Sequence, residues 1–437
     1  MVRDFLRQRE HRITETSIYR ALFATTGLSK NQLAKQLGGS RSSISRLLVS
    51  LEERGAVTRL SGRSGPDRSD IYMVVERSLL SIGAFIGPNA YGVGLVDASG
   101  QVIDRVIGSI HRDTSPDDGA GAIGMAVETI LNRNNLDKRK DVLGLGLSTV
   151  GPLWKRRGVM VKPFHLVAED WNYVPIAELV AMRTGLPTSI DTIAEAALSA
   201  EVIFGRGKEA ESAAYVWFDE GIGTSLYVNG VLGVGEADLS YTLGHLVIEL
   251  DGKRCVCGRQ GCLETYASLP SIYGEVKNRL SEGGFDPPDH DVDRGNASCV
   301  GDSTGASLNC SDALVTLKQL EGQGKAILEE VIYEASKAVA VALTNFVHLT
   351  QPRLLLYGGK TIAAFPQLLD QLPEHIGRLQ THSYQASCQL AHCDFNDESV
   401  IVGSALLPIN KYVGLLSRTV SPGVFDLNEE STATTEG

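Results

Sequence analysis

The chain between residues 244 and 264 reads GHLVIELDGKRCVCGRQGCLE, which gathers one histidine and three cysteines within 18 residues. One imidazole and three thiolates suit a closed, tetrahedral Zn²⁺ site with no position left for water. Gly258 and Gly261 allow the tight turn that returns the chain to the metal. Scattered cysteines and an unrelated histidine rarely fall at such spacing. The stretch therefore predicts a structural Zn²⁺ bound by His245, Cys255, Cys257 and Cys262.

Nothing in the sequence marks the chain for secretion or for a membrane. No apolar run reaches the ~20 residues that a bilayer-spanning helix requires. The first twelve residues are charged and lack the apolar segment of a signal peptide. The four cysteines outside the cluster are dispersed, which argues against a disulfide framework. We expect a cytoplasmic protein without a membrane partner.

The charge of the chain is divided unevenly along its 437 residues, a length that suggests two or three domains. Residues 1–80 carry 14 Lys and Arg against 8 Asp and Glu, whereas the remainder carries 27 basic and 44 acidic side chains. A small basic module on an acidic body is typical of a protein that meets phosphate at one end. The uneven charge is equally compatible with chance variation in surface charge. The choice between this explanation and nucleic-acid binding therefore depends on the motif in the basic module.

The basic module, residues 13–77, has the pattern of three helices followed by a hairpin. A first helix is expected within residues 13–24. Ser29 and Gln32 form a capping box that begins a second helix, and Ser40 is a natural N-cap for a third. Two β-rich segments, 56–60 and 71–75, follow. This order predicts a winged helix-turn-helix, whose third helix enters the major groove of double-stranded DNA.

The third helix is amphipathic, with apolar residues spaced at i, i+3, i+4 and i+7 from Ile44. Its opposite face is polar and basic, and two more arginines lie in the loop of the hairpin. The alternative, a winged helix used only for protein contacts, does not explain basic residues on both helix and wing. The predicted DNA-binding residues are Arg41, Ser42, Ser45, Arg46, Arg63 and Arg68.

The region from residue 78 to 437 contains two Gly-rich hairpins, at 82–97 and 214–233. Two such hairpins in successive halves fit a duplicated, two-lobed α/β architecture, although glycine turns join many strand pairs. We expect a domain boundary at residues 77–78, a division between lobes near 192–205, and a C-terminal return near 395–415.

The cluster motif, His-x9-Cys-x-Cys-Gly-x2-Gly-Cys-Leu-Glu, continues into Thr-Tyr-Ala-Ser268 and resembles the signature of the ROK family (repressors, open reading frames, kinases). The winged helix resembles that of the repressor branch, and the Gly-rich hairpins, Gly358-Gly359 and residues 402–405 match as well. The resemblance implies an actin-like, sugar-kinase (ribonuclease H-like) ATPase fold. It covers nearly the whole chain except residues 283–310, an insertion-like stretch expected to be a mobile loop.

The sequence departs from the family at the positions that serve catalysis. ROK kinases carry an Asp in the first Gly-rich hairpin that organises Mg²⁺ and ATP, and this position corresponds to Phe85, with Asn89 at the family's Thr. A phenyl ring cannot supply the oxygen ligands that Mg²⁺ needs. The catalytic Asp of the family, the general base, corresponds to Ile193. Asp191 would replace it only if the alignment shifts by two residues.

The sugar-binding residues implied by the family are partly retained. The Glu of its Glu-x-Gly-His motif corresponds to Thr242, with Glu236 six residues away, while His245 and Glu264 remain. We therefore predict a carbohydrate-type effector contacting His245 and Glu264, with poor binding of plain glucose because lost acceptors leave hydroxyls unpaired.

Taken together, these features favour a transcriptional regulator, most simply a repressor of carbohydrate-related genes, that is not an enzyme and has no catalytic residues. It is expected to bind operator DNA as a homodimer or homotetramer. Two alternatives stay open at this point. One is an ATP-dependent sugar kinase with a fused regulatory head, which would need Asp191 in its active site. The other is an interaction protein whose winged helix contacts other proteins.

Overall fold

The computed structural model describes residues 13–23, 25–61, 69–111, 114–163, 166, 169–233, 243–284, 310–374, 388–395 and 398–418. Among the sequence predictions, Arg63, Arg68, Thr242, Glu236 and nearly all of the insertion-like stretch lie outside these residues. None of the helices in the described part is long and apolar enough to cross a membrane.

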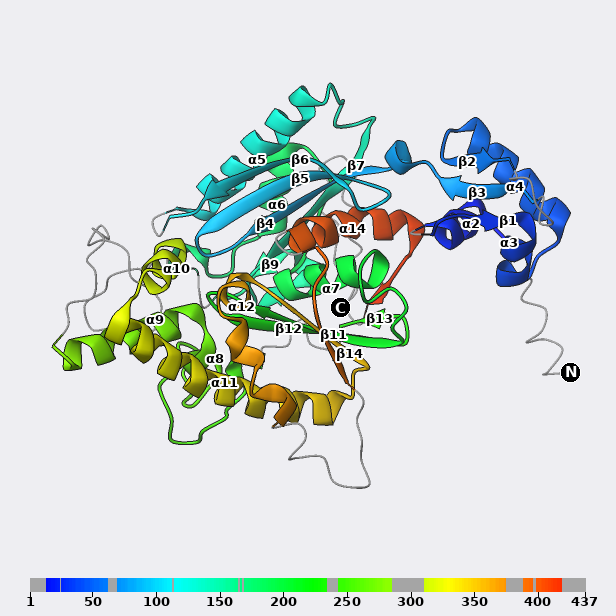
Figure 1. Ribbon diagram of the computed structural model, residues 1–437. Helices are drawn as coiled ribbons and strands as arrows, with labels where there is room; N and C mark the ends of the chain where they lie inside the picture. Colours follow the sequence, from blue (N-terminus) through cyan, green and yellow to red (C-terminus); the bar gives the residue numbers. More distant parts are fainter. Residues whose placement is uncertain are drawn as a thin grey trace, which may run out of the picture.

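The N-terminal module is a winged helix-turn-helix (Figure 1). Ser29 and Gln32 form the predicted capping box at the start of the second helix, and Ser40 caps the third. The three strands pair in the order β1-β3-β2. The helices are α2 (Glu15–Leu22), α3 (Lys30–Leu37) and α4 (Arg41–Glu53), and the strands are β1 (Leu28–Ser29), β2 (Val57–Leu60) and β3 (Ile71–Val74).

Lobe one is a five-stranded sheet in the order β10-β7-β4-β5-β6. Helices α5 (Pro116–Arg133) and α6 (Ile176–Thr184) cover one face of this sheet. They pack there on alternate residues of β4, namely Leu80, Ile82 and Ala84. The strands are β4 (Leu80–Ile86), β5 (Ala90–Asp97), β6 (Val102–Ser109), β7 (Val142–Thr149) and β10 (Thr188–Thr192).

Lobe two is a six-stranded sheet in the order β15-β14-β11-β12-β13-β16. One face of β11 packs on the long helix α11 (Gly322–Thr350) and its neighbours, and the other face packs on α7 (Ile193–Ile203). The strands are β11 (Ser212–Phe218), β12 (Ile222–Val228), β13 (Val231–Leu232), β14 (Leu354–Gly358), β15 (Gln389–His392) and β16 (Ser417–Arg418). The remaining helices are α8 (Glu264–Ala267), α9 (Leu269–Glu282), α10 (Cys310–Lys318) and α12 (Lys360–Ala364).

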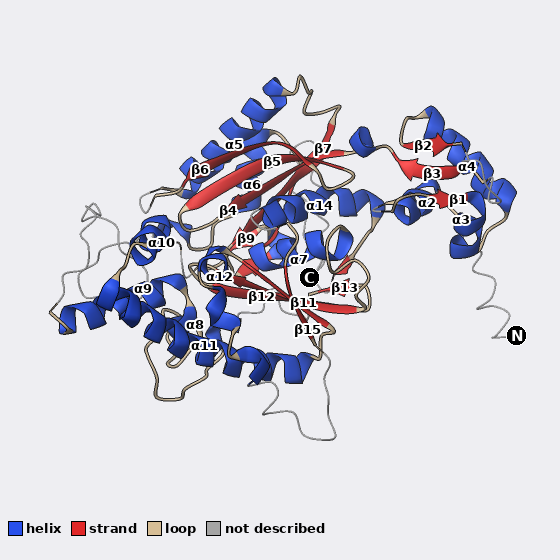
Figure 2. Ribbon diagram, viewed as in Figure 1, coloured by secondary structure: helices blue, strands red, loops and turns tan. Residues whose placement is uncertain are grey.

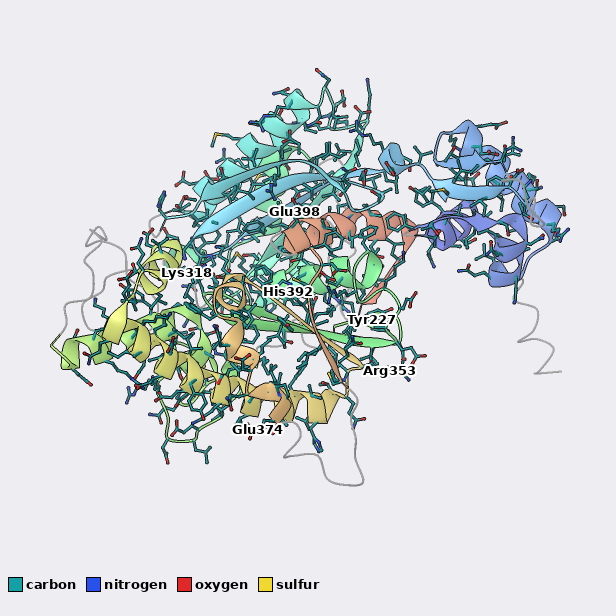
Figure 3. All side chains as sticks on the ribbon, in the orientation of Figure 1. Tyr227, Lys318, Arg353, Glu374, His392 and Glu398 are labelled. Atoms are coloured by element: carbon teal, nitrogen blue, oxygen red, sulfur yellow. The ribbon has the colours of Figure 1, made fainter. Side chains whose placement is uncertain are left out.

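Helices α7 and α14 (Ser399–Val413) lie against each other between the two sheets (Figure 2). Three glycines permit α14 to pack closely on the sheet of lobe one and on α7. A Cβ on Gly83 or Gly146 would lie 1.9 or 1.8 Å from a carbonyl oxygen of α14, and one on Gly403 would lie 1.7 Å from the Ala196 oxygen of α7. An ion pair of 2.7 Å between Glu398, just before α14, and Arg105 of β6 also holds this return of the chain on lobe one (Figure 3).

The winged helix is joined to the body through the far ends of the same two helices. Arg20 Nε of α2 donates a hydrogen bond of 2.6 Å to the carbonyl oxygen of Val413 in α14. The rings of Phe23 and Phe204, the residues that end α2 and α7, lie 5.7 Å apart between centroids. The head, α7 and α14 therefore share one apolar core.

Candidate functional site

The loop that follows residue 244 brings the predicted metal ligands together. The ligand atoms of His245, Cys255, Cys257 and Cys262 all lie within 4.8 Å of one another. Cys257 Sγ and Cys262 Sγ are 3.7 Å apart, and Cys255 Sγ lies 3.4 Å from His245 Nδ1. Sulfur atoms at ~2.3 Å from a tetrahedral Zn²⁺ would be about 3.8 Å apart, so this spacing suits one shared ion.

The backbone of this loop depends on glycine. Gly258 and Gly261 have φ of 88° and 68°, in the left-handed region that L side chains rarely adopt. A Cβ on Gly261 would also lie 1.5 Å from the carbonyl oxygen of Glu249. Burial raises the pKa of the Cys255 and Cys262 thiols, so a bound cation is what would hold them as thiolates. The residues present therefore fit a structural metal centre.

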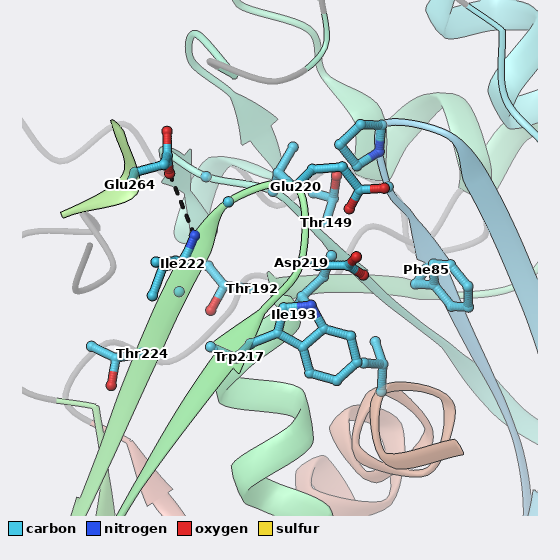
Figure 4. Close-up of a pocket in the computed structure, with 18 of the residues that line it drawn as sticks. Phe85, Thr149, Thr192, Ile193, Trp217, Asp219, Glu220, Ile222, Thr224 and Glu264 are labelled. Atoms are coloured by element: carbon cyan, nitrogen blue, oxygen red, sulfur yellow. Dashed lines mark hydrogen bonds between the residues drawn. The ribbon is translucent and has the colours of Figure 1, made fainter. Parts of the chain in front are cut away.

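A cavity of about 180 Å³ lies where the hairpins of the two lobes meet the start of α7 (Figure 4). Its wall is mostly apolar, with a smaller group of acidic and basic side chains. The lining side chains include Phe85, Asn89, Ile193, Trp217, Asp219, Glu220, His245, Glu264, Lys360 and Val400.

Phe85 and Ile193, which the sequence resemblance aligns with catalytic carboxylates of the ROK kinases, both line this cavity. Phe85 comes from β4 and Ile193 is the first residue of α7. Each has a hydrocarbon side chain, which can neither hold Mg²⁺ nor accept a proton.

Asp191, the possible substitute for the catalytic base, is not among the described residues that line the cavity. It is fully buried in β10, where its Oδ1 lies 3.0 Å from Nζ of Lys155. The same ammonium pairs with Glu195 in α7. Lys155 therefore holds two buried carboxylates by charge, and Asp191 is engaged in this ion pair rather than directed at a substrate.

Several cavity residues were not predicted from the sequence. Asp219 and Glu220 form the turn between β11 and β12, and each is only 7% exposed. Asn89 Nδ2, from the corresponding turn of lobe one, donates a hydrogen bond of 3.0 Å to Glu220 Oε1. The sequence feature that could have identified them is the acidic pair directly before Gly221-Ile222-Gly223. Carboxylates are unexpected in a Gly-rich turn that would otherwise favour phosphate.

The predicted effector contacts lie on the cavity wall as well. Glu264, 2% exposed, begins α8, and its Oε2 accepts a long hydrogen bond of 3.4 Å from the backbone N–H of Ile222. His245 belongs both to the cavity wall and to the cysteine cluster. The metal-binding loop and the cavity thus share one side chain.

The predicted DNA-contacting helix has the expected polarity. Ile44, Leu48 and Leu51 of α4 are buried and Leu47 is half-buried, whereas Arg41, Ser42 and Arg46 are exposed. Ser45 is half-buried and its hydroxyl accepts a hydrogen bond of 3.0 Å from Lys30 Nζ. The exposed face therefore offers two guanidinium groups for base edges or phosphates.

Comparison with known proteins agrees with this architecture. The ROK family profile matches residues 81–411, and the profile of the IclR helix-turn-helix domain matches residues 21–61. A glucokinase of Thermotoga maritima is 26% identical over 74% of this chain and 95% of its own length. A xylose repressor of Caldicellulosiruptor bescii is 21% identical over 88% of this chain and 92% of its own.

Among solved structures, a ROK family transcriptional regulator, a homologue of the E. coli MLC protein, superposes with a TM-score of 0.69 at 18% identity. It covers 93% of this chain and 97% of its own. A ROK family glucokinase from Streptomyces griseus superposes with a TM-score of 0.60 at 22% identity, over 75% of this chain and 98% of its own. These likenesses show a helix-turn-helix head on a sugar-kinase-like body, and with the profile match over most of its length the chain belongs to the ROK family.

Proposed function

We propose that this chain is a sugar-responsive transcriptional repressor whose kinase-like body senses an effector and does not phosphorylate it. The observation that carries the proposal is that two helices, α7 and α14, each run from the cavity to the winged-helix head. Ile193 at the start of α7 and Val400 at the start of α14 line the cavity, while Phe204 and Val413 at their far ends contact α2. At 1.5 Å per residue, α14 spans about 20 Å between the two sites.

This arrangement gives a physical route for regulation. A ligand that binds one arrangement of the lobes more tightly than another shifts the population toward it. Because Gly403 lets α14 pack on α7 at near-contact distance, the two helices would transmit displacement rather than absorb it. In an oligomer, such a shift changes the spacing of paired recognition helices and so the affinity for a two-part operator.

The cavity lining supports a body without kinase activity. Phe85 and Ile193 replace two carboxylates, and phosphoryl transfer needs both a positioned metal and a proton acceptor. Asp219 and Glu220 add negative charge to the hairpin of lobe two, which opposes the phosphates of a nucleotide.

A sugar kinase with a regulatory head is the second candidate, and the glucokinase relatives favour it. Its base would have to be Asp191, whose carboxylate is engaged with Lys155. A direct assay of phosphoryl transfer separates the two candidates.

We further propose that the cysteine cluster binds one structural Zn²⁺. His245, Cys255, Cys257 and Cys262 would supply all four ligands, so the metal stabilises the loop and takes no part in chemistry. Since His245 also lines the cavity, an ordered cluster would fix one wall of the effector site. The effector contacts on that wall would be His245 and Glu264, and plain glucose should bind poorly.

The function can be tested by selecting duplexes from a pool of genomic fragments with the purified full-length chain. A repressor should enrich a small set of sequences with two related half-sites, and its affinity for them should fall steeply with salt. Equal affinity for enriched and random duplexes at physiological salt would contradict the proposal. An effector should then release the enriched duplex.

A further inference from the structure

The cavity between the lobes has an unusual balance of charge. Asp219, Glu220 and Glu264 all line it, and each is almost fully buried. Among the described lining residues, Lys360 is the only one that carries an ammonium or guanidinium group, and His245 is shared with the cysteine cluster. A buried surface with this surplus of carboxylates favours a ligand that brings positive charge.

The rest of the cavity wall is suited to a ligand that combines a positive charge with a ring that has an apolar face. Phe85 stands on lobe one and Trp217 on lobe two, and in Figure 4 the Asp219 carboxylate points into the space between them. Trp217 is itself supported by a stacked ring, Tyr215, at 6.3 Å between centroids. Aromatic faces attract ammonium groups, most strongly where water is excluded, and they also pack on the C–H face of a sugar ring.

The size of the cavity limits the ligand. Its volume of about 180 Å³ is slightly larger than the ~150 Å³ of an apolar protein cavity that holds benzene. One six-membered ring with small substituents therefore fits within it.

We infer that the effector of this cavity is a single-ring carbohydrate derivative with a protonated amino group, held by Asp219 and Glu220 and stacked against Trp217. The carbohydrate part rests on the proposed function, and the positive charge rests on the lining residues. An ammonium that reaches Glu220 also competes with Asn89, whose amide joins the two lobes at that carboxylate. Binding would then alter the contact between the lobes directly.

The test is calorimetry of the zinc-loaded, full-length chain at about pH 6.5 with four sugars of similar size. The sugars are 2-amino-2-deoxyglucose, 6-amino-6-deoxyglucose, glucose and glucuronate. At least one amine should bind about ten-fold more tightly than glucose, and glucuronate should bind most weakly. Equal affinity for amines and glucose, or no binding of either amine, would overturn the inference.

Two isosteric variants show whether the preference arises in this cavity. Asp219→Asn and Glu220→Gln should each reduce the preference for the amine several-fold, and together they should abolish it. Glu178→Gln removes the same charge from an exposed position on α6 and should leave the preference unchanged. An unaltered preference in the double variant would place the cation elsewhere and refute the inference.

The same protein samples should be assayed for binding to the enriched duplex. Specific DNA binding without any preference for amines would refute the inference alone. Absence of specific DNA binding would refute the proposed function, while the calorimetry would still decide the charge of the ligand.

Discussion

Asn89 and Glu220 join the two lobes directly. The side-chain amide of Asn89 donates a hydrogen bond of 3.0 Å to the carboxylate of Glu220, which lies 131 positions further along the sequence. Each residue occupies the turn of its lobe's Gly-rich hairpin. The protein's own side chains therefore link the two lobes at this point.

Replacing Asn89 with Ala should lower the free energy of unfolding by ~1 kcal/mol, because the buried Glu220 carboxylate loses a hydrogen bond. Urea denaturation followed by circular dichroism measures this change. Asn132→Ala, on the exposed surface of α5, is the matched control and should be neutral. Identical unfolding midpoints for the two variants would show that the bond between the lobes does not stabilise the protein.

Replacing Arg41 or Arg46 with Ala should weaken binding to the preferred duplex. A bidentate contact to a base is worth ~1–3 kcal/mol, and a lost phosphate contact should lower the salt dependence by about one unit. Fluorescence anisotropy at several salt concentrations separates these two effects. Arg353→Ala, an exposed arginine on lobe two (Figure 3), should leave both quantities unchanged. If all three variants bind alike, α4 is not the recognition helix.

The purified chain should contain about one Zn²⁺, and Cys257→Ser should lower both the metal content and the melting temperature, because binding energy at a structural site is largely folding energy. Mass spectrometry of metals and differential scanning calorimetry measure these outcomes. Cys388→Ser changes a half-buried thiol outside the cluster and serves as the control. Full stability of chelated wild-type protein would exclude a structural metal.

No hexose should be phosphorylated by ATP at a rate above the uncatalysed background, because the cavity residues that the resemblance aligns with catalytic carboxylates, Phe85 and Ile193, are apolar. A coupled assay for ADP over a panel of hexoses tests this expectation. Turnover that disappears in Asp191→Asn would identify Asp191 as the base and show that the alignment is shifted.

Lys155→Met should destabilise lobe one by at least ~3 kcal/mol, because it leaves the buried carboxylates of Asp191 and Glu195 without their cation. Lys138→Met is a useful contrast. It breaks a surface pair with Glu128 at 2.9 Å, for which a loss below ~1 kcal/mol is expected. Chemical denaturation that gave both variants the same loss would mean that Lys155 is not structurally important.

The sequence was sufficient for the local features of the fold. Ser29 and Ser40 cap the helices as their spacing predicts, and the Gly-rich hairpins form β4–β5 and β11–β12. The cysteine cluster was predictable for the same reason, since its four residues lie within one loop.

Contacts between distant segments were not predictable in this way. In the sequence, Lys155 looks like an ordinary exposed lysine. Only the packing of η2 (Lys155–Arg157) against β10 and α7 buries its side chain beside two carboxylates. Asp219 and Glu220 could be read in the sequence, but not that their turn would face Asn89 of the other lobe. Both cases depend on how the lobes close, which no local pattern specifies.

The junction of Arg20 with the carbonyl of Val413 links positions 393 residues apart. The core of the head includes Leu406, Ile409 and Val413 of α14, which follow the whole first lobe and most of the second in the sequence. Contacts of such long range form late, because the entropy of closing the intervening chain is lost first. A chain that lacks α14 therefore lacks part of the core of the head, so the head cannot complete its folding independently of the body.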